Sequence, residues 1–103
     1  MTPFTSLLFT YGTLMDADTL AKVLGKKLTG KRAVLPQYKK KYEGAYPYLE
    51  KVTSLAPVSV QGVVYEVTDS DLAKLDKWEV EYDRVKVRLS DGRVAVTFNL
   101  KKD

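Results

Sequence analysis

The sequence contains no histidine and no cysteine. Without cysteine there is no disulfide framework, no thiolate nucleophile and no thiolate ligand for a metal. Without histidine the chain lacks the most frequent general base, the most frequent metal ligand and every nucleophile–histidine pair. Any proton transfer must therefore use Asp, Glu, Tyr or Lys, and we expect neither a metal site nor a cofactor.

Long apolar runs are also missing from the sequence. None approaches the roughly 18 residues that a membrane-spanning helix needs, so we expect no membrane partner. Residues 1–4 include no basic side chain, which argues against a secretory signal peptide. The expected location is the cytoplasm, and nothing in the sequence indicates an oligomeric state.

The residues that are present have the composition of a globular protein. The 103 residues are 45% hydrophobic and 29% charged, and seven of them are tyrosines. This length fits one compact domain over residues 1–103. The net charge of +4 weakly favours an anionic partner, although a modest net charge also serves solubility.

Three consecutive lysines, Lys39, Lys40 and Lys41, have two interpretations. In an exposed strand over residues 37–42 they would blunt a sheet edge against pairing with another chain. They would otherwise form a phosphate-binding patch of a nucleic-acid module. We favour the edge role and expect no nucleic-acid partner, because aromatic and basic residues do not interleave as a stacking groove requires.

Hydrophobic periodicity and turn residues predict an α+β domain with a mixed, curved sheet. Asp16 and Gly25 are the expected ends of a first helix, and residues 68–71 begin a second that runs to Trp78 or Glu79. Gly62 indicates a bulge or the close approach of another element. The expected strands cover residues 7–10, 33–35 up to an edge proline, 58–67, 82–89 and 94–98, and residues 43–49 are expected to form a loop.

The first strand leads into a turn that contains Gly12 and Thr13. Glycine allows a backbone geometry and a close approach that a side chain would forbid. Successive N–H groups in such a turn, with the Thr13 hydroxyl beside them, can bind a carboxylate or an oxyanion. The alternative is a tight turn with a buried tyrosine and no ligand.

Glu79 has an unusual position relative to the second helix. On a helical wheel with about 100° per residue and Leu72 at zero, Leu75 lies near about −60° and Glu79 near about −20°. If the helix continues that far, the carboxylate points with the apolar stripe, where burial raises the pKa toward neutrality and suits a general acid/base. If the helix ends at Trp78, Glu79 is a solvated loop residue.

Several segments together resemble the gamma-glutamylcyclotransferase-like (AIG2-like) family. The resemblance covers nearly the whole chain, in order. It rests on Tyr11-Gly12-Thr13-Leu14, Tyr46-Pro47, the segment from Gly62 to Val67, and Leu75-Asp76-Lys77-Trp78-Glu79 followed by Tyr82-Asp83-Arg84. The chain departs from the family pattern at Val80, where the family commonly has glycine.

The resemblance implies a small mixed or antiparallel β-barrel flanked by short helices, with a cavity between the turn and Glu79. Active members convert a γ-glutamyl compound to 5-oxoproline and a free amine. Because the substrate's own α-amine is the nucleophile, no Ser, Cys or His is needed. Glu79 is then the acid/base. The implied substrate-binding residues are Tyr11, Gly12, Thr13, Leu14, Tyr46, Pro47 and Tyr82.

We therefore expect a γ-glutamyl small molecule as the partner. We also expect the Glu79 carboxylate to open into a pocket bordered by residues 11–14, with a raised pKa unless Arg84 pairs with it. A non-catalytic protein of the same fold that binds small carboxylates is the alternative function.

Overall fold

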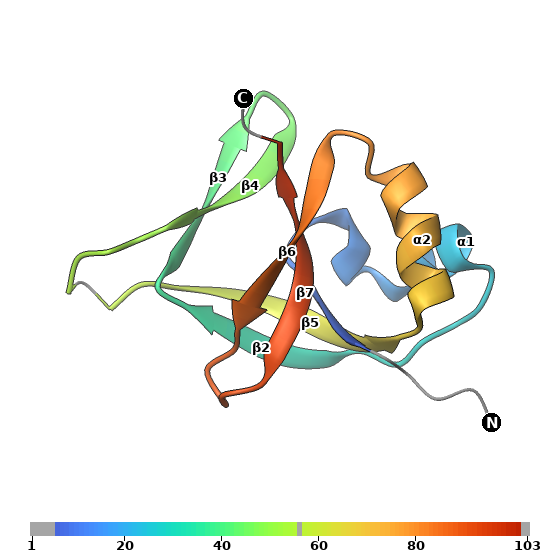
Figure 1. Ribbon diagram of the computed structural model, residues 1–103, viewed down its shortest axis with the longest axis horizontal. Helices are drawn as coiled ribbons and strands as arrows, with labels where there is room; N and C mark the ends of the chain where they lie inside the picture. Colours follow the sequence, from blue (N-terminus) through green and yellow to red (C-terminus); the bar gives the residue numbers. More distant parts are fainter. Residues whose placement is uncertain (1–5, 56, 102–103) are drawn as a thin grey trace.

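The computed structural model describes residues 6–55 and 57–101 (Figure 1). Its helices are η1 (Thr13–Met15, a single 3-10 turn), α1 (Ala17–Leu24) and α2 (Asp69–Trp78). Its strands are β1 (Ser6–Thr10), β2 (Lys31–Pro36), β3 (Tyr38–Glu43), β4 (Tyr46–Lys51), β5 (Ser59–Val67), β6 (Tyr82–Arg88) and β7 (Val94–Leu100). Neither α-helix in the described part of the chain has the length and apolar character needed to cross a membrane.

The strands form a five-stranded sheet in the order β2-β5-β1-β7-β6 and a separate hairpin of β3 and β4. The central strand β1 is parallel to β7 and antiparallel to β5, so the sheet is mixed and the predicted α+β class is confirmed. Figure 1 shows α1 and α2 side by side at one end of this sheet, with the β3–β4 hairpin rising at the other.

The predicted closure into a barrel is not confirmed. The edge strands β2 and β6 approach each other where the Ser90 N–H donates to the Val34 carbonyl at 2.9 Å. No ladder between described strands joins these edges. The chain leaves the sheet after β2 at Gln37, whose φ of 66° is left-handed, so β3 starts a second sheet instead of extending the first.

Residues 43–49 were expected to form a loop, and this prediction is wrong. Gly44 and Ala45 form a two-residue turn, and Gly44 has a φ of 59°. Tyr42 pairs with Pro47 across the hairpin. Proline suits this place because each strand of a two-stranded sheet has a free edge, so its missing N–H disrupts no inner ladder.

Both helices begin and end at the predicted residues. Asp16 precedes α1, and its carboxylate accepts a hydrogen bond from the Thr19 hydroxyl at 2.8 Å. Gly25 ends the helix in a left-handed conformation with a φ of 76°. Thr68 and Asp71 form a capping box at the start of α2, which satisfies two backbone N–H groups that a helix start leaves unpaired.

The core has two parts, one on each face of β1. Leu8 packs with α1, α2 and Phe98, whereas Phe9 packs with Leu35 and Leu49 toward the hairpin. Burial on both faces explains why β1 is a short, continuous apolar run. The close approach predicted at Gly62 is confirmed, because an added Cβ there would lie 2.2 Å from the Thr10 carbonyl oxygen.

The three lysines lie on β3, and all are exposed, as predicted. Lys41 forms an ion pair with Glu50 at 3.0 Å, and the Lys40 ammonium lies 5.5 Å from the centre of the Tyr42 ring. The ion pair crosses the hairpin from β3 to β4, whereas the contact between Lys40 and Tyr42 lies along β3.

Candidate active site

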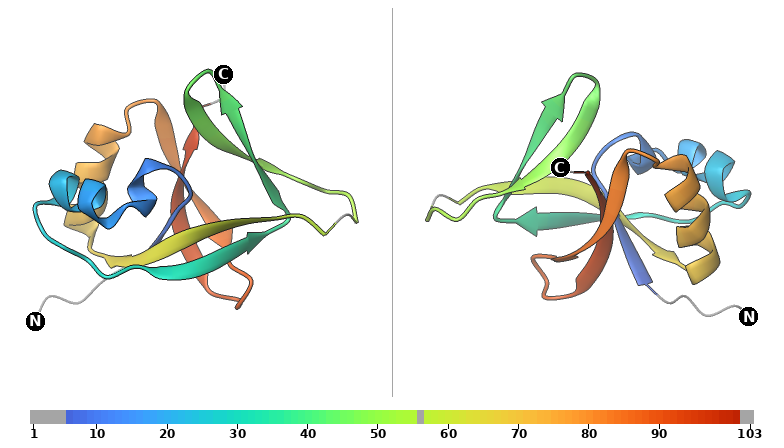
Figure 2. Two further views of the ribbon diagram at one scale, coloured as in Figure 1. Left: turned by 180° about the vertical axis from the view of Figure 1, so that it is seen from behind. Right: turned by 45° about the horizontal axis from the view of Figure 1, so that its top comes forward.

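A cavity of about 380 Å³ lies where the end of β1, the hairpin and the end of α2 meet. Its lining comes from residues 8–14, 45–47, 78–82 and 97–98. The volume is that of a small-molecule site. All the predicted site residues line it: Tyr11, Gly12, Thr13, Leu14, Tyr46, Pro47, Glu79 and Tyr82. Figure 2 shows from two further sides how the hairpin and the helices flank this region.

The turn after β1 borders the cavity with its main chain. Among the described residues, no acceptor is recorded for the N–H groups of Gly12, Thr13 and Leu14, as expected at the start of a helical turn. Gly12 has a φ of −132°, so no left-handed geometry requires glycine here. An added Cβ would lie 3.3 Å from Pro47 Cγ, so a side chain at this position would crowd the proline of the hairpin.

Tyr11 is buried at the base of this turn. Its hydroxyl donates to the Phe98 carbonyl at 2.6 Å, which ties the turn to β7. Burial, with smaller contributions from Tyr82 and Glu79, raises the Tyr11 pKa well above its usual value. The phenol is therefore neutral at physiological pH and already uses its proton in a backbone hydrogen bond.

Glu79 lines the cavity although α2 ends one residue earlier. The helix stops at Trp78, and the Glu79 N–H donates to the Leu75 carbonyl at 2.7 Å as the closing bond of the helix. The assumption that the helix continues through Glu79 is therefore wrong. The alternative of a solvated loop residue is also wrong, since the side chain is half-buried.

Burial raises the pKa of Glu79 from 4.5 to about 7. Arg84 does not oppose this shift, because its guanidinium is bonded to both carboxylate oxygens of Asp76, at 2.9 and 2.5 Å. Among the described residues, no cation lies within ion-pair distance of Glu79. Near neutral pH this carboxyl group can both accept and donate a proton.

Two side chains, Tyr82 and Asn99, form hydrogen bonds to the backbone of the β3–β4 hairpin beside the cavity. The Tyr82 hydroxyl donates to the Pro47 carbonyl at 2.7 Å, and burial together with the nearby charge of Glu79 raises the Tyr82 pKa to about 12. The Asn99 amide accepts from the Leu49 N–H at 2.9 Å and donates to the Leu49 carbonyl at 3.0 Å. The Asn99 side chain thus joins β7 to β4, which belong to different sheets.

Sequence reasoning missed part of this lining. Thr97 and Phe98 reach the cavity because β7 lies parallel to β1, a pairing that no local pattern indicates. Trp78 belongs to a segment on which the family resemblance rests, and Glu81 directly precedes Tyr82 in the sequence. Within residues 6–55 and 57–101, no group of three acidic side chains could hold a metal ion.

A protein-family model described as gamma-glutamyl cyclotransferase, AIG2-like, matches residues 8–101. The chain belongs to this family. Among curated proteins, no sequence matches this AIG2-like chain. The resemblance inferred from the sequence motifs is therefore confirmed at the level of the family.

Solved structures support the fold of the AIG2-like chain. An Arabidopsis thaliana protein solved in solution has a TM-score of 0.76 and 24% identity, and the alignment covers 97% of this chain and 66% of that protein. A second Arabidopsis thaliana protein has a TM-score of 0.73 and 26% identity, with 95% and 71% covered. The AIG2-like chain thus spans just under two thirds of the first of these proteins.

A structure named gamma-glutamyl cyclotransferase is also similar, with a TM-score of 0.69 and 19% identity over 94% of this chain and 67% of that one. At identities this low, the similarity shows that the folds are alike. It does not show that the proteins act on the same substrate.

Proposed function

We propose that this chain catalyses the cyclisation of a γ-glutamyl compound to 5-oxoproline with release of a free amine. The observation that carries the proposal is the half-buried Glu79 carboxyl group, with a pKa of about 7, in a cavity bordered by the 11–14 turn. A carboxyl group that titrates near neutral pH without a paired cation is suited to proton transfer.

In the proposed reaction the substrate supplies its own nucleophile. Ionised Glu79 takes a proton from the substrate α-ammonium group, and the freed amine nitrogen attacks the γ-carbonyl carbon. The new C–N bond closes the five-membered ring, and Glu79 returns the first proton to the departing nitrogen as the original amide C–N bond breaks. The ring nitrogen loses its second proton to the same carboxylate, which passes it to the released amine, so the products are 5-oxoproline and an ammonium ion. No water, metal or redox partner enters the balance.

The turn after β1 supports the same reaction electrostatically. The N–H groups of Gly12, Thr13 and Leu14 have no recorded acceptor among the described residues. They are available to hold the substrate carboxylate, or the carbonyl oxygen as charge develops on it. Tyr11 and Tyr82 line the cavity as neutral side chains, and both phenolic protons are used in hydrogen bonds to backbone carbonyls.

The second candidate function is binding of a small carboxylate without turnover. The N–H groups of the turn, which have no recorded acceptor among the described residues, favour it. They can bind such a ligand without any help from Glu79. Binding without formation of 5-oxoproline would select this candidate.

The experiment is incubation with a panel of γ-glutamyl amines and amino acids, with 5-oxoproline measured by mass spectrometry. Glu79→Gln keeps the side-chain shape and should reduce turnover by about 10²- to 10⁴-fold. Glu79→Asp withdraws the carboxyl group by one methylene and should also impair turnover, because misplacement alone is costly. The control is Glu66→Gln, at an exposed position on β5. Parent-like turnover by Glu79→Gln would remove Glu79 from the mechanism.

A further inference from the structure

An open groove lies beside the cavity, and Glu79 lines both hollows. Asp76 and Arg84 line the groove together with it. No lysine or arginine of the described residues lines the main cavity, so a cation from this part of the chain has to reach Glu79 from the groove. The groove thus brings together the carboxyl group proposed to transfer protons and a guanidinium group that is able to neutralise it.

The local structure directs Arg84 toward the end of α2. Asp76 and Glu79 are three residues apart, and the Glu79 N–H still makes the helical bond to the Leu75 carbonyl, so the two acidic residues are neighbours on one side of the helix end. Arg84 shares a face of β6 with Tyr82, because side chains alternate along a strand. Tyr82 lines both hollows. The Arg84 side chain therefore leaves β6 on the side where two carboxyl groups lie next to each other.

Of these two carboxyl groups, Asp76 binds the guanidinium. Arg84 Nε lies 2.9 Å from one carboxylate oxygen of Asp76, and Arg84 Nη2 lies 2.5 Å from the other. Two such bonds fix the plane of the guanidinium as well as its position. The Arg84 and Asp76 side chains are 41% and 46% exposed, and an ion pair this exposed adds little to folding stability. Its main consequence is that Glu79 is left without this cation.

The other charged and titratable groups around Glu79 come from several elements. Those that line the groove are Asp76, Tyr82, Asp83, Arg84 and Lys101. Those that line the cavity are Tyr11, Tyr46, Glu81 and again Tyr82. Within residues 6–55 and 57–101, no cation lies within ion-pair distance of Glu79, and burial is the recorded cause of its raised pKa. The paired Asp76 and Arg84 carry no net charge, so together they leave that shift in place.

We propose that Asp76 is a positioning residue that holds the Arg84 guanidinium away from Glu79, so that the carboxyl group in the cavity has no paired cation. Asp76 does not line the main cavity and acts only through Arg84. The consequence for catalysis rests on the function proposed above, in which Glu79 accepts a proton and returns it. A guanidinium bonded to Glu79 would stabilise the ionised form, which makes the carboxylate a weaker base and hinders its protonation.

The test measures the ionisation of Glu79 itself. The signal of its side-chain carboxyl carbon is followed by NMR in isotope-labelled protein from about pH 4 to about pH 9, and Glu79→Gln identifies the signal. Asp76→Asn keeps the side-chain shape and removes the charge that holds Arg84. We expect the Glu79 pKa to fall from about 7 to about 6 or below, because an opposite charge nearby lowers a carboxyl pKa by about 1–3.

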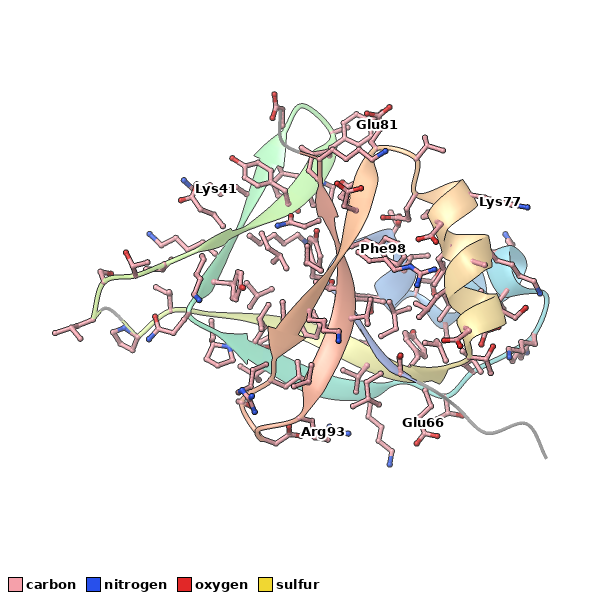
Figure 3. The ribbon with its side chains drawn as sticks, in the orientation of Figure 1. Lys41, Glu66, Lys77, Glu81, Arg93 and Phe98 are labelled. Carbon is pink, nitrogen blue, oxygen red and sulfur yellow. The ribbon has the colours of Figure 1, made fainter. Side chains whose placement is uncertain are left out.

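The double variant Asp76→Asn/Arg84→Gln should return the Glu79 pKa to about 7, because no guanidinium remains to pair with it. Asp91→Asn is the matched control, since it breaks another exposed ion pair, between Asp91 and Arg93 at 2.7 Å, that lines neither hollow. Figure 3 shows Arg93 and Glu81 at opposite ends of the paired strands β6 and β7. This control should keep the parent pKa of Glu79.

Two results would overturn the proposal. One is an unchanged Glu79 pKa in both Asp76→Asn and Asp76→Ser, which remove the same carboxylate by different substitutions and make the test independent of how one variant folds. The other is an equal fall in the double variant, which would assign the effect to Lys101 or to the lost charge of Asp76. A fall that only the variants retaining Arg84 show would support it.

The pH profile of turnover separates this inference from the proposed function. For any γ-glutamyl compound that the parent cyclises, the acid limb of kcat/KM should follow the Glu79 pKa and move to lower pH in Asp76→Asn. An acid limb that does not move would overturn the role of Asp76 and leave the cyclotransferase proposal intact. If no compound is cyclised and the Glu79 pKa still falls in Asp76→Asn, the role of Asp76 is supported and the cyclotransferase proposal fails.

Discussion

Replacing Glu79 by glutamine should stabilise the folded protein, and the gain should depend on pH. Burial raises the Glu79 pKa from 4.5 to about 7, so the folded state binds this proton more tightly than the unfolded state does. Between these pH values the unfolded chain loses the proton first, and the stability of the parent falls as pH rises. Glutamine carries no charge and escapes this loss.

The size of the effect follows from the same pKa values. A rise from 4.5 to about 7 corresponds at most to about 3.5 kcal/mol, at about 1.4 kcal/mol per pKa unit. Because Glu79 is only half-buried, water screens part of this penalty, and we expect about 1–2 kcal/mol in practice. For a domain of this size, that is a rise in Tm of about 5–15 °C.

The assay is urea unfolding of the parent and Glu79→Gln from about pH 4 to about pH 8, followed by tryptophan fluorescence or circular dichroism. The difference in unfolding free energy should be near zero at the acid end and reach its maximum above about pH 7. Contributions from Asp16 and Asp71, whose pKa values are lowered, are common to both proteins and cancel. A difference that stays constant over this range would refute desolvation as the cause of the raised pKa.

Three further predictions concern packing and surface charge. Asn99→Ala should remove both side-chain hydrogen bonds to the Leu49 backbone and lower the unfolding free energy by about 2 kcal/mol. Hydrogen exchange at the Leu49 amide should become faster, and unchanged exchange would mean that contacts other than Asn99 hold the hairpin in place. Gly62→Ala should cost about 3 kcal/mol or prevent folding, because its Cβ would lie 2.2 Å from the Thr10 carbonyl oxygen, and a parent-like melting curve would contradict this contact. Alanine at all of positions 39–41 should leave turnover of any γ-glutamyl substrate unchanged, whereas loss of tight, salt-sensitive RNA or DNA binding in that variant would overturn the edge role of these lysines.

The sequence alone determined the features that depend on near neighbours in the chain. Thr68 and Asp71 cap α2 because their side chains reach backbone groups only three residues away, and this geometry repeats wherever such residues precede a helix. The short apolar run of β1 reports its burial directly. The motifs around Gly12, Tyr46, Gly62 and Glu79 together indicated the family that the comparison then showed.

Other features were decided by contacts that no short segment contains. The proline and glycine of residues 43–49 indicate a break, yet pairing with β3 makes most of that stretch a strand. From the sequence alone, Arg84 could have formed an ion pair with Glu79. It binds Asp76 instead, because β6 packs against α2 and brings Arg84 next to Asp76. The open sheet follows from the left-handed turn at Gln37, which sends β3 and β4 into a sheet of their own.

The tertiary structure also decided the chemistry of Glu79. A helical wheel points the side chain inward only while the helix continues, and the helix ends before it. The side chain is half-buried because the 11–14 turn, the hairpin and β7 enclose the same cavity, and residues from these segments lie far apart in the sequence. Desolvation depends on everything that surrounds a group, so a pKa of about 7 is a property of the assembled fold, whereas the presence of a carboxyl group at that place is a property of the sequence.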